Sequence, residues 1–327
     1  MNSPRKQAFT LVELLVVIAI ILTLFCLVSP HGQQSREGER KKTCKHNLKQ
    51  LHTALLSRET SQKNFPGYIN TLGQPNGYKT RASWVVKTFD YIEQAPLSAR
   101  WEQGEYVFPP IEILECPSDP AEKVEQPNLS YVANTGYIDS NTENKANGIF
   151  FDLTRTAAGA PGPEDERDKA SAPEIIMTID YIQSHDGATR TLLLSENNNA
   201  LFWGYTTPVE QQTLPDQKYH FGFCWEQPAV IANTVGPSLR KSRRINGNDG
   251  YEMKTKFKEL IPNDGFPSSN HPGGVNVAFV GGNVSFLDNQ IDPLVYAQLM
   301  TPNGKESDLK TVEGKPESEL KPPADQY

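Results

Sequence analysis

An uninterrupted apolar run near the N-terminus constrains this chain more than any other feature. Residues 9–28 read FTLVELLVVIAIILTLFCLV and contain one charged side chain, that of Glu13. A helix of this length crosses the hydrocarbon core of a bilayer, which is about 30 Å thick. A carboxylate inside that core is costly unless it meets a partner. The run therefore predicts a transmembrane helix over residues 9–28, in which Glu13 has a functional partner.

The residues that flank the run argue against a cleaved secretory signal peptide. Such a peptide has an apolar stretch of about 7–15 residues, followed by a cleavage site of small residues. Here the run is longer and no such site follows it. The leader, residues 1–8, has Arg5 and Lys6 as its only charged side chains. An ordinary signal anchor remains an alternative interpretation.

The order of residues at the start of the run is more specific than an anchor requires. The sequence AFTLVE, from Ala8 to Glu13, resembles the prepilin cleavage and methylation signal of type IV pilins and type II secretion pseudopilins. The resemblance implies that a prepilin peptidase cuts between Ala8 and Phe9 and that the new amine is methylated. It also implies that Glu13 neutralises the Phe9 amine of a neighbouring subunit during assembly, since two charges that are costly alone in lipid are tolerable as a pair. The family prefers Gly before the cut, where this chain has Ala8.

The rest of the chain is polar and rich in turn-forming residues. It has 327 residues, 25 Pro and 23 Gly, a net charge of −7 and a mean hydropathy of −0.53. Proteins that bind nucleic acid present basic patches to the phosphate backbone. We therefore expect no nucleic-acid partner for this acidic chain.

The chain has four cysteines, Cys26, Cys44, Cys116 and Cys224, and none of them forms a C-x-x-C pair. This spacing disfavours a zinc ribbon. Outside the cytoplasm disulfides persist, and a Cys44–Cys116 bond would tie the helical region to the globular part. Cys224 remains an alternative partner, because sequence does not show geometry.

Hydrophobic periodicity predicts an α+β fold in which a long N-terminal helix packs on an antiparallel sheet. The helix is expected to continue over residues 29–60, since Leu48, Leu51 and Leu55 recur on one face. Residues 275–280 and 283–287 flank a Gly-Gly pair and predict a β-hairpin. Segments of strand composition also include residues 129–132, 148–151, 175–182, 189–195 and 219–225. We expect a pilin-like globular domain over residues 61–304 and a disordered tail over residues 305–327.

Several short segments, taken in order, resemble a large bacterial family of prepilin-like proteins with a domain of unknown function. They are CKHNLKQ (44–50), NFPG (64–67), CPSDP (116–120) and HPGGVNVAF (271–279). That family is known for a C-terminal motif of His, nine residues and then Asp-Gly. Here His271 begins the motif, and Gly281 and Gly282 stand at the Asp-Gly positions. Because the Asp is absent, His271 is interpreted as a hydrogen-bonding latch rather than a metal ligand.

The two resemblances imply a pilin-like or pseudopilin-like structural subunit of a type IV pilus-like or type II secretion system. It would lie in the cytoplasmic membrane with a single pass and its C-terminal domain outside the cytoplasm. Its partners would be prepilin peptidase, other pilin-like subunits and membrane lipid. None of the six histidines stands in a known catalytic spacing, so we expect no enzyme, no cofactor and no metal. The alternative is a membrane-tethered surface binding module that does not polymerise.

Overall fold

The computed structural model describes residues 10–28, 31–73, 75, 77, 79–120, 127–138, 144–154, 175–198, 200, 202–204, 217–226, 244–247 and 265–311. Within these ranges the side chains of residues 24–28, 31–35, 79, 217, 310 and 311 are not described. The cleavage positions predicted from the sequence, Ala8 and Phe9, lie outside the described residues, as does the tail from residue 312.

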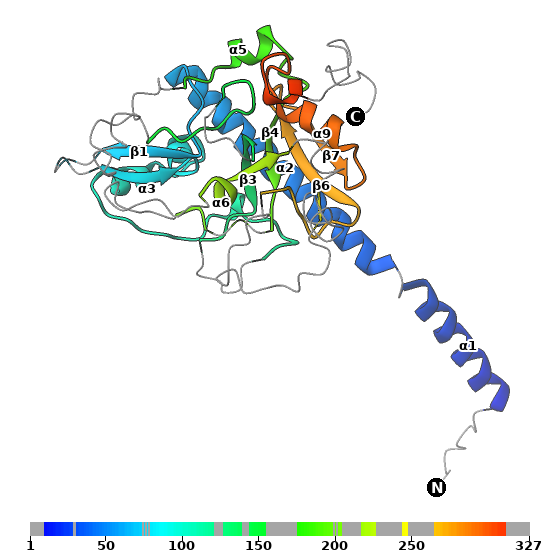
Figure 1. The fold of residues 1–327 in the computed structure, drawn as a ribbon. Helices are drawn as coiled ribbons and strands as arrows, with labels where there is room; N and C mark the ends of the chain where they lie inside the picture. Colours follow the sequence, from blue (N-terminus) through cyan, green and yellow to red (C-terminus); the bar gives the residue numbers. More distant parts are fainter. Residues whose placement is uncertain are drawn as a thin grey trace.

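Helix α1 (Leu11–Val28) projects from the rest of the molecule and carries the N-terminus away from it (Figure 1). It begins with a capping box: the Thr10 hydroxyl accepts a hydrogen bond from the Glu13 backbone N–H, while Glu13 Oε2 accepts one from the Thr10 backbone N–H. Every described side chain of α1 is exposed. Within the described part of the chain, no helix combines the length and the apolar character needed to cross a membrane.

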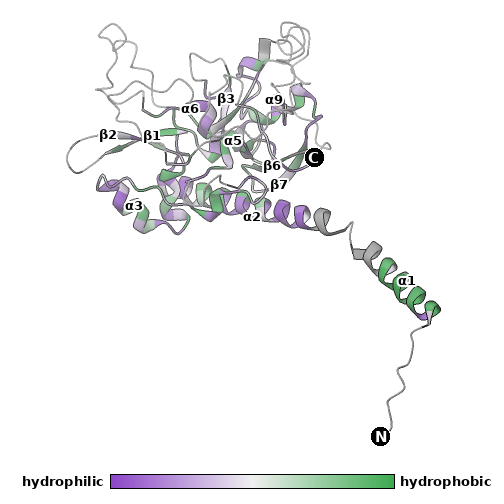
Figure 2. Ribbon diagram, turned by 90° about the horizontal axis from the view of Figure 1, so that it is seen from below, coloured by the Kyte–Doolittle hydropathy of each residue, from purple (hydrophilic) through white to green (hydrophobic). Residues whose placement is uncertain are grey.

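Helix α2 (His31–Gln62) lies across the globular part and packs against its main sheet (Figure 1). Its exposed half is polar (Figure 2), whereas Cys44, Leu48, Leu51 and Leu55 are fully buried. These positions recur every three to four residues and so lie on one helix face. The helix predicted over residues 29–60 is therefore confirmed for its described residues and ends close to the expected point.

The main sheet has five strands in the order β5-β3-β4-β6-β7. They are β3 (Tyr131–Tyr137), β4 (Leu192–Glu196), β5 (Gly222–Trp225), β6 (Gly274–Phe279) and β7 (Val284–Asp288). The pairs β3–β4, β4–β6 and β6–β7 are antiparallel, but β3 and β5 are parallel. The expectation of a purely antiparallel sheet is corrected accordingly: the sheet is mixed, and the fold class is α+β.

The C-terminal hairpin predicted from the Gly-Gly pair is confirmed. Strands β6 and β7 pair antiparallel from Gly274–Asp288 to Ala278–Val284. Gly282 takes φ +93°, a conformation that glycine adopts without strain. The turn is closed by hydrogen bonds from Phe279 N–H to Asn283 O and from Gly282 N–H to Phe279 O.

Smaller elements surround the main sheet. A separate two-stranded antiparallel sheet consists of β1 (Ile69–Gly73) and β2 (Lys79–Ser83). The helices are η1 (Val86–Tyr91), α3 (Ala95–Glu102), η2 (Glu112–Leu114), α5 (Ile179–Ser184), α6 (Gln217–Phe221), α9 (Pro293–Met300) and η3 (Asp308–Thr311). All four tryptophans, Trp84, Trp101, Trp203 and Trp225, are fully buried in the core between these elements.

Three segments differ from the sequence predictions. Residues 148–151 are buried but form no strand, because Ile149 and Phe150 both donate their N–H to the carbonyl of Asn134. Residues 175–182, expected as a strand, lead into α5 instead. Thr178 caps the N-terminus of this helix, because its side chain accepts a hydrogen bond from the Tyr181 N–H. Residues 219–225 divide between α6 and β5.

The ordered chain also extends past residue 304, where the globular domain was expected to end. Helix η3 follows, and Leu309 within it is fully buried. The expectation of disorder from residue 305 is therefore wrong up to Thr311.

Candidate functional site

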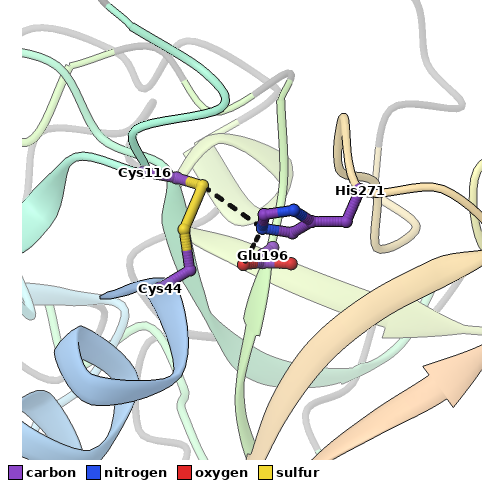
Figure 3. Close-up of side chains that lie close together, drawn as sticks. All are labelled: Cys44, Cys116, Glu196 and His271. Carbon is purple, nitrogen blue, oxygen red and sulfur yellow. Dashed lines mark hydrogen bonds and ion pairs between the residues drawn. A yellow bond between two sulfur atoms is a disulfide. The ribbon is translucent and has the colours of Figure 1, made fainter. Parts of the chain in front are cut away.

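Five side chains from distant parts of the sequence meet where α2 crosses the main sheet. We call Glu37, Cys44, Cys116, Glu196 and His271 the His271 cluster. Four of them, all except Glu37, are drawn in Figure 3. Cys44, Cys116, Glu196 and His271 are each at most 3% exposed, so these four side chains lie in the protein interior.

Helix α2 supplies Glu37 and Cys44. The two residues are seven positions apart, which is close to two helical turns, so both side chains point toward the sheet. Cys44 forms a disulfide with Cys116, with the two Cα atoms 5.4 Å apart. This is the pair that the sequence favoured; the alternative, Cys224, is buried in β5, where its thiol contacts the carbonyl of Gly265.

The loop after η2 supplies Cys116. The loop is held to the start of β3 by a hydrogen bond from Ser130 N–H to Leu114 O. Ser118 Oγ lies 3.0 Å from both carboxylate oxygens of Glu37, and Ser118 O accepts from the Asn270 amide. The loop therefore bridges α2 and the segment that precedes β6.

Glu196 ends β4, the central strand of the sheet. Its Oε2 accepts from the Asn276 backbone N–H and its Oε1 from the Asn276 side-chain amide, each at 2.8 Å. These two bonds from β6 fix the orientation of the carboxylate.

The His271 imidazole lies between two carboxylates. Its Nδ1 is 2.5 Å from Glu37 Oε1, and its Nε2 is 3.2 Å from Glu196 Oε1 and 3.5 Å from Cys116 Sγ (Figure 3). Only the protonated imidazolium carries hydrogens on both nitrogens and can donate to both acids. Burial by itself would lower the pKa of His271, but the hydrogen bonds and charges of Glu196 and Glu37 outweigh burial and raise that pKa.

This arrangement can hold α2 on the sheet in two ways at once. The disulfide joins α2 to the loop after η2 covalently. The imidazolium joins Glu37 on α2 to Glu196 on β4 by charge. A charge buried between paired partners is stable only while both partners remain.

The two halves of the His-x9-Gly-Gly motif lie at opposite ends of β6. His271 precedes the strand, whereas Gly281 and Gly282 follow it, about 20 Å away at the usual rise of a strand. At that far end, Lys49 donates to Gly282 O and His52 Nε2 donates to Val280 O at 2.9 Å. Burial lowers the pKa of His52 despite this bond, so the imidazole is neutral.

Glu37 is the member of the cluster that sequence reasoning missed. Its only sequence signal is its spacing of seven from Cys44, on a helix whose polar half looks solvent-exposed. Glu13, by contrast, lies far from the cluster, on α1. There its carboxylate oxygen Oε2 accepts hydrogen bonds from the Thr10 backbone N–H at 2.9 Å and from the Thr10 hydroxyl at 2.7 Å.

Comparisons with known proteins agree with this organisation. The family described as "Protein of unknown function (DUF1559)" matches residues 33–294, and the "Prokaryotic N-terminal methylation motif" matches residues 3–25. The type IV major pilin protein PilA of Myxococcus xanthus (strain DK1622) is 32% identical over 71 residues. That alignment covers 22% of this chain and 32% of the pilin, so the chain spans about a third of the length of that relative. No solved structure matches the chain.

The two matches divide the chain where the structure divides it. The methylation motif covers most of α1, and the larger match covers nearly all of α2, the cluster and all five strands of the main sheet. The chain is a member of the DUF1559 family that begins with a prokaryotic N-terminal methylation motif.

Proposed function

We propose that this protein is a membrane-anchored, pilin-like structural subunit. The apolar surface of α1 carries the proposal. Of the described residues, the large apolar side chains that are exposed lie on α1, with the exceptions of Phe108 and Ile176. This surface is the green helix of Figure 2. An apolar surface of this extent needs lipid or another protein to cover it.

The proposed processing follows from the N-terminal motif. Prepilin peptidase would cut between Ala8 and Phe9, and the new amine would be methylated. The subunit would lie in the cytoplasmic membrane through α1, with the globular part outside the cytoplasm. The match to the methylation motif and the partial similarity to a type IV major pilin support this proposal.

Assembly would bring the Phe9 amine of one subunit to Glu13 of the next. In the chain before assembly, Glu13 already completes the capping box with Thr10. The carboxylate therefore has a structural role as well as the proposed assembly role, and a test has to separate the two. Glutamine also serves in capping boxes but carries no charge.

Three variants separate capping from charge pairing. Glu13→Gln keeps the cap and removes the charge, and we expect it to abolish incorporation into filaments. Thr10→Ala weakens the cap by about 1 kcal/mol and keeps the charge, and we expect it to assemble. Glu13→Ala removes both the side-chain cap and the charge. Assembly of Glu13→Gln at the wild-type level would overturn the proposed charge pairing.

The mature N-terminus tests processing directly. Mass spectrometry of the protein from its native cell should find a chain that begins at a methylated Phe9. An intact Met1, or a cut at another position, would overturn the processing step. Loss of surface filaments or loss of protein secretion in deletion strains would distinguish a type IV pilus-like subunit from a type II secretion pseudopilin.

A specific cavity favours a second candidate, a membrane-tethered binding module that does not polymerise. The cavity has a volume of about 220 Å³ and lies between α2, η1 and α3. Arg58 and Lys87 line it beside Tyr91 and Trp101. Burial lowers the pKa of both Arg58 and Lys87. Glu13→Gln discriminates here also: a binding module would keep its activity as a monomer.

A further inference from the structure

We propose that the His271 cluster binds a zinc ion when the disulfide is reduced. The ligands would be the thiolates of Cys44 and Cys116, the Nε2 atom of His271 and a carboxylate oxygen of Glu196. These four donor atoms already lie within 4.8 Å of one another. The inference concerns the globular part and does not depend on the proposed assembly of the subunit.

Two distances in the cluster are close to those of a tetrahedral zinc site. Zinc binds sulfur at about 2.3 Å and imidazole nitrogen or carboxylate oxygen at about 2.0–2.2 Å, which places neighbouring ligand atoms about 3.3–3.8 Å apart. His271 Nε2 lies 3.5 Å from Cys116 Sγ and 3.2 Å from Glu196 Oε1. The two sulfur atoms have to separate once their bond is broken, and no pair of the four donor atoms is more than 4.8 Å apart beforehand.

The imidazole is oriented as metal-bound histidines usually are. A histidine that binds a metal through one nitrogen commonly donates its other N–H to a carboxylate, which fixes the tautomer and the ring plane. Here Glu37 Oε1 lies 2.5 Å from His271 Nδ1. This contact leaves Nε2 to face both Cys116 and Glu196 (Figure 3). Asn276 orients the Glu196 carboxylate in the same way, through two hydrogen bonds.

The donor set and its burial point to zinc in a closed structural site. Thiolate and imidazole ligands favour zinc over magnesium or calcium, which prefer oxygen atoms. Each of the four ligand residues is at most 3% exposed. Four protein ligands with no water position are typical of structural zinc sites. Two thiolates and one carboxylate supply three negative charges, which the two positive charges of the ion largely neutralise.

The conversion of the disulfide form into the zinc-bound form balances in electrons and protons. A dithiol reductant gives two electrons and two protons to the Cys44–Cys116 bond and itself becomes a disulfide. The sulfur–sulfur bond breaks and two thiols form. Zinc then displaces a proton from each thiol and the Nε2 proton of His271, and these protons pass to solvent. In the reverse step a disulfide oxidant takes two electrons from the two thiolates and becomes a dithiol with two protons from solvent, the Cys44–Cys116 bond forms again, and the ion is released.

Both states would hold α2 on the sheet. In the oxidised chain the connection is the disulfide together with the charged imidazole. In the reduced chain it is one metal ion with ligands from α2, the loop after η2, β4 and the segment before β6. The reduced chain would then keep its tertiary structure, although the disulfide is lost.

Cobalt(II) is the probe for the test, because its visible absorption reports coordination geometry. Full-length protein in detergent is reduced with a phosphine, desalted without oxygen and titrated with Co²⁺. We expect one ion per chain, the intense visible bands of tetrahedral cobalt, a sulfur charge-transfer band in the near ultraviolet, and displacement of cobalt by Zn²⁺. The oxidised chain should show none of these. X-ray absorption at the zinc edge should count two sulfur ligands.

Variants assign the ligands. His271→Ala and Cys44→Ala remove ligands and should weaken binding by more than about 100-fold, whereas Glu37→Gln acts through the imidazole and should weaken it about 10–100-fold with the tetrahedral bands retained. Cys224→Ala is the matched control, since it removes a buried cysteine outside the cluster, and it should bind as the wild type does.

Three results of the binding experiments would each overturn the proposal. They are failure of the reduced wild-type chain to bind cobalt stoichiometrically, an octahedral spectrum, or binding that His271→Ala leaves unchanged. Sulfur counting on the wild-type chain does not depend on whether a variant folds: a count of zero or three sulfur ligands excludes this ligand set. Far-ultraviolet circular dichroism of the reduced chain with and without zinc shows whether the metal preserves the fold.

Discussion

Replacing His271 with alanine in the oxidised chain tests how much the buried charge contributes to stability. The substitution leaves Glu196, which is 1% exposed, without its cationic partner. Breaking a buried ion pair by removing one partner costs about 3–5 kcal/mol. Loss of the contact with Glu37 adds little to this cost, since the Glu37 side chain is 28% exposed and water can replace the lost contact. We therefore expect His271→Ala to lower the free energy of unfolding by about 4 kcal/mol.

Urea unfolding followed by tryptophan fluorescence measures this loss, because all four tryptophans are buried. With an unfolding slope of about 3 kcal/mol per molar urea, the midpoint should fall by about 1 M or more. Thiol titration confirms that the disulfide is still present in the variant. His185→Ala is the matched control: among the described residues, the exposed His185 side chain contacts its own turn, through hydrogen bonds with Tyr181 O and Ser184 and a ring contact with Tyr181. It should change stability by less than about 0.5 kcal/mol.

A double-mutant cycle with Glu196→Gln attributes the loss to the charge pair. If the pair is the cause, the double variant loses less than the sum of the two single variants, by about 1–3 kcal/mol. A loss below about 1 kcal/mol for His271→Ala, or strict additivity with Glu196→Gln, would refute the reasoning. Either result would mean that Glu196 is satisfied by Asn276 alone.

Three further predictions concern the disulfide and two other parts of the fold, and urea unfolding measures each. Replacing Cys44 and Cys116 together with alanine removes a cross-link between residues 72 positions apart, which should cost about 4 kcal/mol; a loss under 1 kcal/mol would contradict this. Burial lowers the pKa of His220 to about 4, so as the pH falls below about 6.5 the histidine is protonated in the unfolded chain but stays neutral in the folded chain. Between about pH 7 and pH 4 the free energy of unfolding of the wild type should therefore fall by about 3 kcal/mol more than that of His220→Leu. Equal decreases would exclude the effect. Gly148→Ala places a methyl group 2.5 Å from the backbone of β3 and should cost about 3 kcal/mol, whereas Gly38→Ala meets nothing within 4 Å on α2 and should gain up to about 1 kcal/mol.

Local signals in the sequence predicted the elements that local physics determines. The buried stripe of α2 follows from the spacing of Leu48, Leu51 and Leu55, and the C-terminal hairpin follows from Gly281 and Gly282 between two apolar runs. The parallel pairing of β3 with β5 had no such signal. Parallel strands need a long connection, and the residues that decide their pairing are far apart in the sequence.

The segments that were predicted wrongly are those where a capping residue or a close backbone contact outweighs strand composition. Residues 175–182 contain β-branched side chains, but Thr178 caps a helix and Asp180 lies in its first turn. Residues 148–151 are apolar, but Gly148 lies against the backbone of β3 too closely for a side chain. Neither contact can be inferred from composition alone.

The His271 cluster was predicted only in part for a related reason. Cys44–Cys116 was the preferred pair among few cysteines, with Cys224 left open as an alternative partner, and His271 stood out through its motif. Glu37 lies 234 positions from His271 and belongs to a polar helical segment with many charges. Only the course of α2 over the sheet brings the two together.

The attachment of α2 at both ends of one strand has a mechanical consequence. Near the start of α2, Glu37 and Cys44 hold it at the His271 end of β6, and further along, Lys49 and His52 hold it at the turn after β6. Helix and strand therefore run side by side in the same direction. A tensile force applied to α1 would load these attachments in shear, all together rather than one after another. The globular part would therefore resist the force as a unit, and α2 would not separate from the sheet one contact at a time.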